Sequence, residues 1–382
     1  MIFKKKLIYL DNAATTPLDP AVTAAMLPFF EEKFGNASSS HRAGRDAKDA
    51  MEKARAAIAK SIGARPEEIF FTSGGTEANN FAIKSAAFSN RSKGNHIITS
   101  RIDHDCVLNS CKWLESQGFK VTYLDVDREG FVNIDELEAV INPKTILVSI
   151  IHGNNEIGTI QDIAAIGKLC RDRGVYFHTD ACQSYTKTEI DVKKQDLDMV
   201  TLNAHKIHGP KGVGALYIRE GVSIGEWQSG GGHERGFRSG TENIAGIIGF
   251  AEAVKTGMDR KHRLRMAELR DRLIDSILRI DGAQLNGPSG NRRLCNNANF
   301  LFPKISNAGE LIGGYLDQKG ICSSAGSACS VHSKEPSHVL LAIGIGREEA
   351  FCGLRLTISR FTTEQEVDDA VKALQGIVKK IS

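Results

Sequence analysis

The sequence predicts an α/β protein whose mostly parallel sheet is covered by helices on both faces. Strand-like and helix-like stretches alternate from about residue 48 to 220, a pattern typical of parallel sheets. Of the 382 residues, 41% are hydrophobic and 25% charged, so the chain can bury a large core without disulfides. Short strands and helices resume after a charged, periodic stretch at 251–280. We therefore expect a second, smaller α+β domain at the C-terminal end.

The elements follow from hydrophobic periodicity and from glycine turns. Apolar residues at helical spacing predict a helix over 48–62, which Gly63 ends, and the glycine turn at 73–77 opens a helix that reaches about residue 88. The other helices are expected near 107–117, 134–141, 163–173 and 251–280, and the seven strands at 69–72, 96–100, 120–124, 145–152, 176–179, 199–204 and 214–218. The glycine-rich stretch 229–240 has no period and predicts a functional loop. We place the domain boundary along the long helix, near 255–265.

Composition and charge exclude several classes of protein. The 49 Lys+Arg against 46 Asp+Glu leave a net charge of +3, too small to indicate a nucleic-acid partner. No apolar run approaches the ~20 residues that span a bilayer, and the apolar stretch near the N-terminus has about four residues where a signal peptide needs roughly 7–15. The eight cysteines form no CxxC pair, which fits reduced thiols. These features predict a cytoplasmic protein without membrane or direct nucleic-acid partners.

One lysine stands at the end of a predicted buried strand. Lys206 precedes a glycine-proline turn, where desolvation would lower its pKa as a Schiff-base lysine requires. Taken alone, a lysine at a strand end is more often a surface residue.

Three further features also follow predicted strands, at the sheet edge where α/β proteins bind ligands. Asp180 would pair there with a protonated pyridine nitrogen, although an aspartate at this place also fits a helix N-cap. Gly75 and Thr76 lie in a strand-to-helix turn that suits a phosphate, a common kind of turn. His104 follows another strand, where a lone histidine is more often structural. Together with Lys206 they favour a chemical role over the separate structural ones.

Seven motifs then occur in one order along the chain. They are Tyr9-Leu10-Asp11-Asn12-Ala13-Ala14-Thr15-Thr16-Pro17, Phe34-Gly35-Asn36, Thr72-Ser73-Gly74-Gly75-Thr76-Glu77-Ala78-Asn79-Asn80, Asn154-Asn155-Glu156-Ile157-Gly158, His205-Lys206, Arg238-Ser239-Gly240-Thr241 and Ser327-Ala328-Cys329. In these motifs the chain resembles, end to end, the cysteine desulfurases of the NifS/IscS type, which are class V aminotransferase-like enzymes of fold type I that use pyridoxal 5'-phosphate. The resemblance implies a large cofactor-binding domain at 16–257 and a small domain formed by 1–15 and 258–382.

The resemblance also implies a role for each cofactor-binding residue. Lys206 would hold the cofactor as a Schiff base and move a proton, Asp180 would hold the pyridinium proton, and His104 would stack on the ring. Gln183 would bond the phenolic oxygen. The implied phosphate ligands are Gly75, Thr76, Asn203, His205 and, from the second subunit of an obligate homodimer, Thr241. Asn203 stands where the family commonly has serine, and its amide can still donate to phosphate.

The substrate site and the sulfur acceptor come from the same resemblance. Asn155 and Arg355 match the groups that bind the substrate carboxylate, which the planar fork of arginine grips with two hydrogen bonds. Cys329 matches the sulfur acceptor, and the small residues around it predict an exposed loop that suits a nucleophilic thiol. The implied reaction converts L-cysteine to L-alanine and a persulfide on Cys329. That persulfide would pass to an iron–sulfur scaffold or a sulfur-carrier protein.

Two other functions remain open from the sequence. A selenocysteine lyase or related β-lyase would keep Lys206 but would not need Cys329 for L-cysteine, and a non-catalytic scaffold would need neither. No metal site is expected, because Cys182 and its alternating neighbours lack a CxxC or HxxxH partner. Cys182 is predicted to pack in the core, as are Cys106 and Cys111 along one helix.

Overall fold

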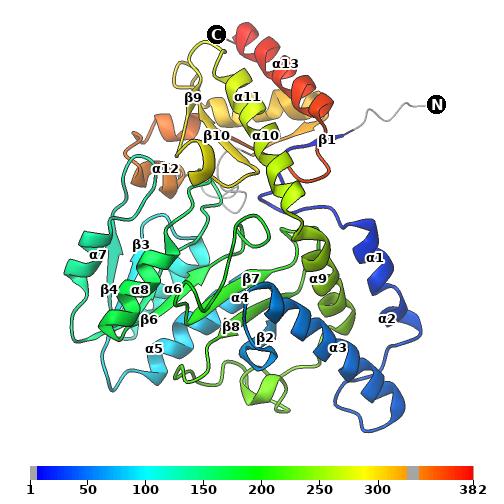
Figure 1. Ribbon diagram of the computed structural model, residues 1–382. Coiled ribbons are helices and arrows are strands. Elements are labelled where there is room, and N and C mark those ends of the chain that lie inside the picture. The colour runs from blue at the N-terminus through cyan, green and yellow to red at the C-terminus, as the bar shows by residue number, and fades with distance from the viewer. Residues whose placement is uncertain (1–6, 325–334, 382) are drawn as a thin grey trace.

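Figure 1 shows the computed structural model as two groups of helices and strands, one above the other. The structure describes residues 7–324 and 335–381. The lower group surrounds a seven-stranded sheet, and the upper group contains a three-stranded sheet and a two-stranded pair. Among the described helices, none combines the length and apolar character that crossing a membrane requires.

The seven-stranded sheet has the strand order β2-β8-β7-β6-β5-β3-β4. Its strands are β2 (Ile69–Thr72), β3 (His96–Ser100), β4 (Lys120–Leu124), β5 (Thr145–Ser149), β6 (Tyr176–Asp180), β7 (Met199–Asn203) and β8 (Gly214–Ile218). Only β8 runs against its neighbours, and the other pairings are parallel. The predicted mostly parallel, seven-stranded α/β sheet is therefore confirmed: four strands have their predicted bounds, and the other three end within three residues of their predicted ends.

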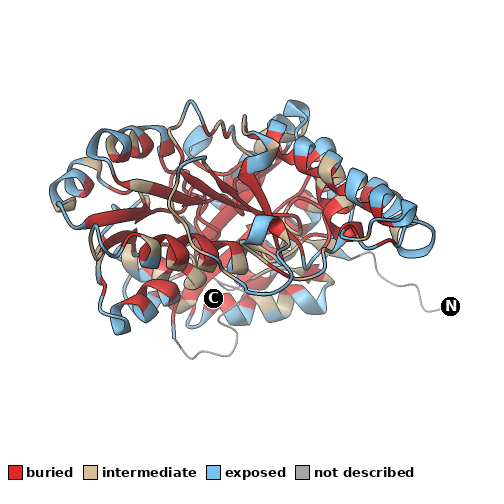
Figure 2. Ribbon diagram, turned by 90° about the horizontal axis from the view of Figure 1, so that it is seen from below, coloured by how far each residue is buried: buried red, intermediate tan, exposed pale blue. Residues whose placement is uncertain are grey.

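Helices cover both faces of this sheet, as its buried strands in Figure 2 require. They are α1 (Pro20–Met26), α2 (Pro28–Glu31), α3 (Arg42–Ser61), α4 (Gly75–Asn80), α5 (Ala86–Ser89), α6 (Asp105–Ser116), α7 (Ile134–Val140), α8 (Ile163–Arg173) and α9 (Ile244–Gly257). Successive strand residues point to opposite faces, so Phe71 and Val148 join one apolar cluster while Phe70 and Leu147 join another.

Two predicted helices are interrupted. The single helix predicted over 251–280 is wrong, because α9 ends at Gly257 and α10 (Arg260–Ile277) begins anew. The carboxylate of Asp259 caps α10 by accepting the backbone N–H of Lys261 at 2.9 Å, which makes a new helix start favourable there. The helix predicted from the glycine turn to residue 88 contains a π-helical turn at Phe81–Ser85 between α4 and α5.

The upper group has a core of its own. The antiparallel sheet places β10 (Asn297–Leu301) between β9 (Gln284–Leu285) and β12 (Gly353–Thr357), and β1 (Ile8–Tyr9) pairs with β11 (Ile321–Cys322). Its helices are α10, α11 (Ala308–Gln318), α12 (His338–Ala342) and α13 (Glu364–Ile381). Leu10 belongs to the apolar cluster of this group. We therefore keep 16–257 as the proposed large domain and 1–15 with 258–382 as the proposed small one.

Candidate active site

A cavity of about 230 Å³ lies at the carboxyl ends of the central strands. Nine of the predicted site residues line it: Gly75, Thr76, His104, Asn155, Asp180, Gln183, Asn203, His205 and Lys206. They come together because the segments that follow β2, β3, β5, β6 and β7 all leave the sheet at or beside this edge. Thr241 and Arg355 do not line the cavity, and Cys329 lies outside the described residues.

Asp180 ends β6 and is buried in the wall of the cavity. Its Oδ1 accepts the backbone N–H of Cys182 at 2.8 Å, and its Oδ2 accepts the side-chain amide of Asn79 at 2.7 Å. Each carboxylate oxygen has two acceptor sites, so each can accept one more hydrogen bond. Asp180 is thus equipped to accept an N–H from a protonated pyridine ring.

His104 is the N-cap of α6 and lines the same cavity as Lys206. Its Nδ1 accepts the backbone N–H of Cys106 at 3.2 Å and lies 3.1 Å from the Cys106 sulfur. Burial lowers the pKa of His104, while Asp180 acts in the opposite direction. The ring is therefore held at one nitrogen by the start of α6.

The proposed phosphate ligands form a narrow part of the cavity. A Cβ on Gly75 would lie 2.5 Å from the Cys182 sulfur and 3.4 Å from Nδ2 of Asn203, so only glycine fits without movement. The Oδ1 of Asn203 is buried without a hydrogen-bond partner in the described part of the chain. Burial lowers the pKa of His205 to about 4, so its ring is neutral at pH 7. The groups here that can donate to a bound oxyanion are Nδ2 of Asn203, which lies beside the space at Gly75, and the one N–H of the neutral His205 imidazole.

The loops that carry Lys206 and Gln183 are tied together by Lys187. Its Nζ donates to the carbonyl of Gln183 at 2.8 Å and to that of Lys206 at 3.2 Å. Burial lowers the pKa of Lys187 to about 8. The side-chain amide of Gln183 donates to the carbonyl of Ala13 at 2.8 Å, which also fixes the N-terminal segment against the site.

Arg355 lies in β12 and is 1% exposed. One guanidinium nitrogen donates to the carbonyl of Asn155 at 3.0 Å, and the other terminal nitrogen forms an ion pair with Asp11 at 3.0 Å. Its Nε is buried and has no hydrogen-bond partner within the described ranges. Arg355 therefore stands beside Asn155, a lining residue, with one edge of its fork unused.

Described residues on both sides of 325–334 are anchored to this site. On one side, Ser324 and Arg355 exchange two backbone hydrogen bonds, at 3.1 and 2.7 Å. On the other side, the hydroxyl of Ser337 donates to the carboxylate of Glu156 at 2.5 Å, and Nε2 of His338 lies 3.0 Å from the carbonyl of Asp103. The chain thus leaves Arg355 and returns beside His104.

Thr241 is exposed and follows the loop predicted at 229–240. Two ion pairs hold this loop. Glu234 accepts two hydrogen bonds of 2.8 Å from Arg55 in a buried pair, and Arg238 binds the carboxylate of Glu77 at 2.7 and 3.1 Å. Because Glu77 lies next to Thr76 in α4, the loop is fixed beside the narrow part of the cavity.

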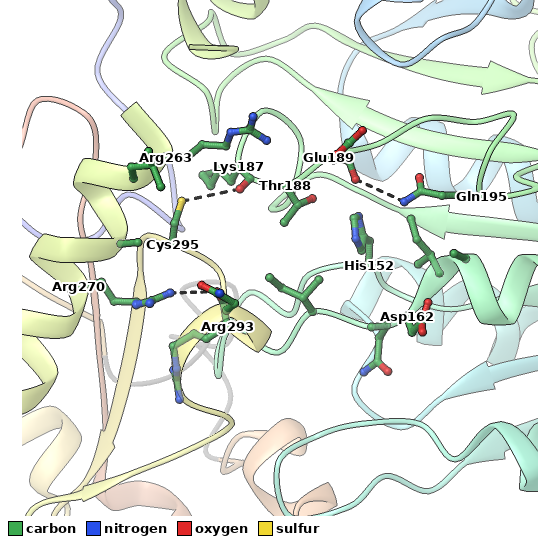
Figure 3. Close-up of a pocket in the computed structure, with 17 residues that line it drawn as sticks. His152, Asp162, Lys187, Thr188, Glu189, Gln195, Arg263, Arg270, Arg293 and Cys295 are labelled. Atoms are coloured by element: carbon green, nitrogen blue, oxygen red, sulfur yellow. Dashed lines mark hydrogen bonds between the residues drawn. The ribbon is translucent and has the colours of Figure 1, made fainter. Parts of the chain in front are cut away.

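A second cavity of about 410 Å³, shown in Figure 3, lies behind the loop that carries Lys187. The sulfur of Cys295 is 4.0 Å from the carbonyl of Lys187, and the carbonyl of Arg293 accepts from Arg270 at 3.0 Å. None of the predicted site residues that the structure describes lines this cavity. Lys187, which lines it, is hydrogen-bonded to the carbonyls of Gln183 and Lys206 in the candidate active site.

Several residues of the site were missed by the sequence analysis. Cys106 and Cys182 line the cavity, which the sequence did not indicate, and they also pack as predicted: Cys182 is buried with the core residues, and Cys106 packs against the apolar cluster that contains Cys111. Asn79 was quoted only as part of a motif, and its spacing of three from Thr76 on a helix was a usable signal. Nothing local marked Lys187. Among the described residues, no group of three His, Cys, Asp or Glu side chains is arranged to hold a metal ion.

Comparisons with known proteins agree over almost the whole chain. A family model for class-V aminotransferases matches residues 8–370. The cysteine desulfurase IscS of Clostridium botulinum is 48% identical over 379 residues, which cover 98% of this chain and 95% of the relative. The IscS of Methanosarcina thermophila is also 48% identical, with 99% and 93% covered. Among solved structures, a NifS-like protein has a TM-score of 0.92 at 37% identity, covering 98% of this chain and 100% of its own. SspA, solved in complex with cysteine, has a TM-score of 0.83 at 37% identity, covering 93% and 99%.

Proposed function

The chain belongs to the class-V aminotransferase family and, within it, to the cysteine desulfurases, and from this we propose that it converts L-cysteine to L-alanine with Cys329 as the sulfur acceptor. The predicted fold type I architecture agrees with the same relatives. The observation that carries the proposal for this chain is the convergence of nine predicted residues, Lys206 and Asp180 among them, on one cavity.

Enzymes of this family depend on pyridoxal phosphate, and the cavity supports the same cofactor here. Asp180 has acceptor sites left for a ring nitrogen, Gly75 leaves room that a side chain would fill, and Nδ2 of Asn203 lies beside that room as a hydrogen-bond donor. Once bound, the cofactor supplies an electron sink for the substrate Cα. We propose Gly75, Thr76, Asn203, His205 and Thr241 as its phosphate ligands and Gln183 as the ligand of its phenolic oxygen.

The chain's own residues then have distinct tasks. Asp180 keeps a proton at the ring nitrogen by accepting its hydrogen bond. Lys206 holds the cofactor, removes the proton from the substrate Cα and returns it. His104 covers one wall of the cavity and holds a proton near the reacting sulfur, since its depressed pKa keeps the ring neutral at pH 7.

Asn155 and Arg355 bind the substrate carboxylate in this proposal. The unused Nε–H of Arg355 and its neighbouring terminal N–H point the same way in a guanidinium, so together they match the two oxygens of a carboxylate. The carbonyl of Asn155 holds the other terminal nitrogen in place at 3.0 Å.

Cys329 completes the reaction by attacking the substrate sulfur. A sulfur–sulfur bond forms and the Cβ–S bond breaks; the electron pair of the broken bond stays with carbon, which takes up a proton and becomes the methyl group of alanine. Ser324 is anchored to Arg355 and lies five positions before Cys329, so a fully extended chain allows a reach of up to roughly 17 Å from that anchor. The persulfide would then pass to an iron–sulfur scaffold or a sulfur-carrier protein.

The experiment that tests this function is Cys329→Ser in the purified holoenzyme. The variant should bind the cofactor and show the wild-type change in its visible spectrum on adding L-cysteine, yet form no alanine, because a serine hydroxyl is far too weak a nucleophile toward sulfur. Cys322→Ser is the matched control and should keep its activity. A Cys329→Ser protein that released alanine at near the wild-type rate would favour the lyase instead.

The cofactor attachment has its own test. Borohydride reduction followed by peptide mapping should place the cofactor on the peptide that contains Lys206. A label on Lys211, which lies five positions later in the sequence, would contradict the assignment.

A further inference from the structure

A thiol in the wall of the cavity connects Asp180 and His104, two residues proposed to contact the cofactor. The amide nitrogen of Asn79 donates to Asp180 at 2.7 Å and also to the sulfur of Cys106 at 3.1 Å. The same sulfur lies 3.1 Å from Nδ1 of His104. Asn79 is 1% exposed and Asp180 is 4% exposed, so water does not replace these contacts. A continuous set of hydrogen bonds therefore runs from Asp180 to His104.

The direction of each hydrogen bond follows from the chemistry of the groups. A backbone N–H only donates, so Nδ1 of His104 must accept from the backbone N–H of Cys106. A neutral imidazole has one protonated nitrogen, which places the proton of His104 on Nε2. The amide of Asn79 also donates, so the sulfur of Cys106 accepts from it. The thiol hydrogen then donates to Nδ1 of His104, whose single lone pair it shares with the backbone N–H of Cys106.

This direction requires a protonated thiol, and the surroundings supply one. Burial, reinforced by the nearby Asp180, raises the pKa of Cys106 to about 12. Cys106 is thus a hydrogen-bond donor near pH 7 and a poor nucleophile, which separates its role from that proposed for Cys329.

We propose that Cys106 is a positioning residue: its thiol joins Asn79 to Nδ1 of His104 and holds the imidazole in one orientation with its proton on Nε2. The inference rests on the proposed function only for the role of His104 in the reaction. With Nδ1 occupied twice, Nε2 is the nitrogen that remains for the cofactor or the substrate. His104 therefore enters the reaction as a proton donor at Nε2.

The test compares Cys106→Val with Cys106→Ser in the holoenzyme. Valine has a similar size and cannot donate, whereas serine can donate to Nδ1. A donor at Nδ1 stabilises the neutral ring, so valine should raise the pKa of His104 by about 0.5 to 1 unit and serine should leave it closer to the wild-type value. The charged and titratable groups around His104, which are Asp180, Lys206, Asp105 and His338, are unchanged in both variants.

The readout is the ¹⁵N spectrum of histidine-labelled protein as a function of pH, with His104 assigned from the His104→Gln variant. The control is Cys111→Val, since Cys111 is a buried thiol of the same helix that packs in an apolar cluster. The acidic limb of the pH profile of alanine formation should move with the ¹⁵N titration in Cys106→Val and stay in place in Cys111→Val.

Three results would overturn the inference. They are an unchanged His104 titration in Cys106→Val, an equal shift in Cys111→Val, and a wild-type spectrum with the proton on Nδ1. Because the ¹⁵N titration needs no turnover, it gives the same answer whether or not the Cys329→Ser experiment supports the proposed desulfurase reaction.

Discussion

Replacing Arg355 by alanine should weaken the use of L-cysteine mainly through binding. The guanidinium is 1% exposed and already pairs with Asp11 and with the carbonyl of Asn155, while its Nε has no partner among the described residues. A substrate carboxylate that uses the Nε edge therefore forms a charge-assisted pair in a water-poor place. Removing one partner of such a pair costs about 2–5 kcal/mol, so kcat/KM should fall by roughly 30-fold to several thousand-fold.

How the fall in kcat/KM of Arg355→Ala divides between KM and kcat shows whether Arg355 acts in binding or in the chemical step. In the proposed site Arg355 would contact the carboxylate before and during the chemical step, so most of the loss should be in KM, with kcat within about tenfold of the wild type. Arg355→Lys keeps the charge and loses the planar fork, so its kcat/KM should lie between those of the wild type and of Arg355→Ala. Steady-state alanine formation over a range of L-cysteine concentrations measures both constants.

Asp11→Asn is the matched control for this prediction. It removes the ion pair with Arg355 but leaves the guanidinium in place, so a purely structural role of the pair would make the two variants equally defective. A carboxylate-binding role predicts a much smaller rise in KM for Asp11→Asn. An Arg355→Ala enzyme whose kcat/KM lies within about threefold of the wild type, below 1 kcal/mol, would refute the assignment.

Three further predictions concern protonation and assembly. Burial raises the pKa of Asp103 to about 7, so the native state binds more protons than the unfolded chain between about pH 4 and 7. The free energy of unfolding should therefore fall by roughly 4 kcal/mol as the pH rises through that window. Asp103→Asn should remove this pH dependence, which thermal melts at a series of pH values would measure. The pKa of Lys187 near 8 lies below its usual 10.5, so the free energy of unfolding of the wild type should rise by about 2–3 kcal/mol between pH 8 and 10.5. Lys187→Met should lack this rise. The loss of the Lys187 hydrogen bonds should also lower kcat by about 3- to 10-fold. Heterodimers of Lys206→Ala and Thr241→Ala subunits should contain one site with neither lesion and exceed both parents in activity; equal activity would argue that each site is built from one chain.

The sheet could be predicted from the sequence because its signals are local. Buried strands give short apolar runs bounded by turns, and 69–72, 96–100, 120–124 and 214–218 are the strands of the structure without change. Of the nine predicted residues that line the cavity, Gly75, Thr76, His104, Asp180 and Lys206 were indicated by their places after predicted strands, and the other four by the family resemblance. Their meeting follows from parallel strands that end at one edge. The break before α10 was missed because periodicity continues across it, although Asp259 carried a capping signal.

Contacts between distant residues were beyond prediction for a physical reason. The pair of Arg355 with Asp11 joins positions 344 apart, and no local pattern records such a distance. The surroundings of Cys106 depend on the start of α6, because the helix that His104 caps places the thiol beside Asn79 as well as against the apolar cluster that holds Cys111. If α6 began one residue earlier or later, a different side chain would lie beside Asn79. Helix ends are the least certain feature of a sequence pattern.

The N-terminal segment explains how residues of two separate cores keep a fixed geometry at one site. Its backbone pairs with β12, where the N–H of Thr357 donates to the carbonyl of Leu10 at 2.7 Å and the amide of Asn12 donates to that of Thr357 at 2.7 Å. A few residues later, the hydroxyl of Thr16 donates to the carbonyl of His205 at 2.8 Å. The same short stretch is thus bonded both to the strand that carries Arg355 and to the loop that carries Lys206. Because backbone hydrogen bonds fix the segment at both ends, Arg355 cannot move away from Lys206 without breaking them. The proposed carboxylate site therefore stays in a fixed position relative to the proposed cofactor site.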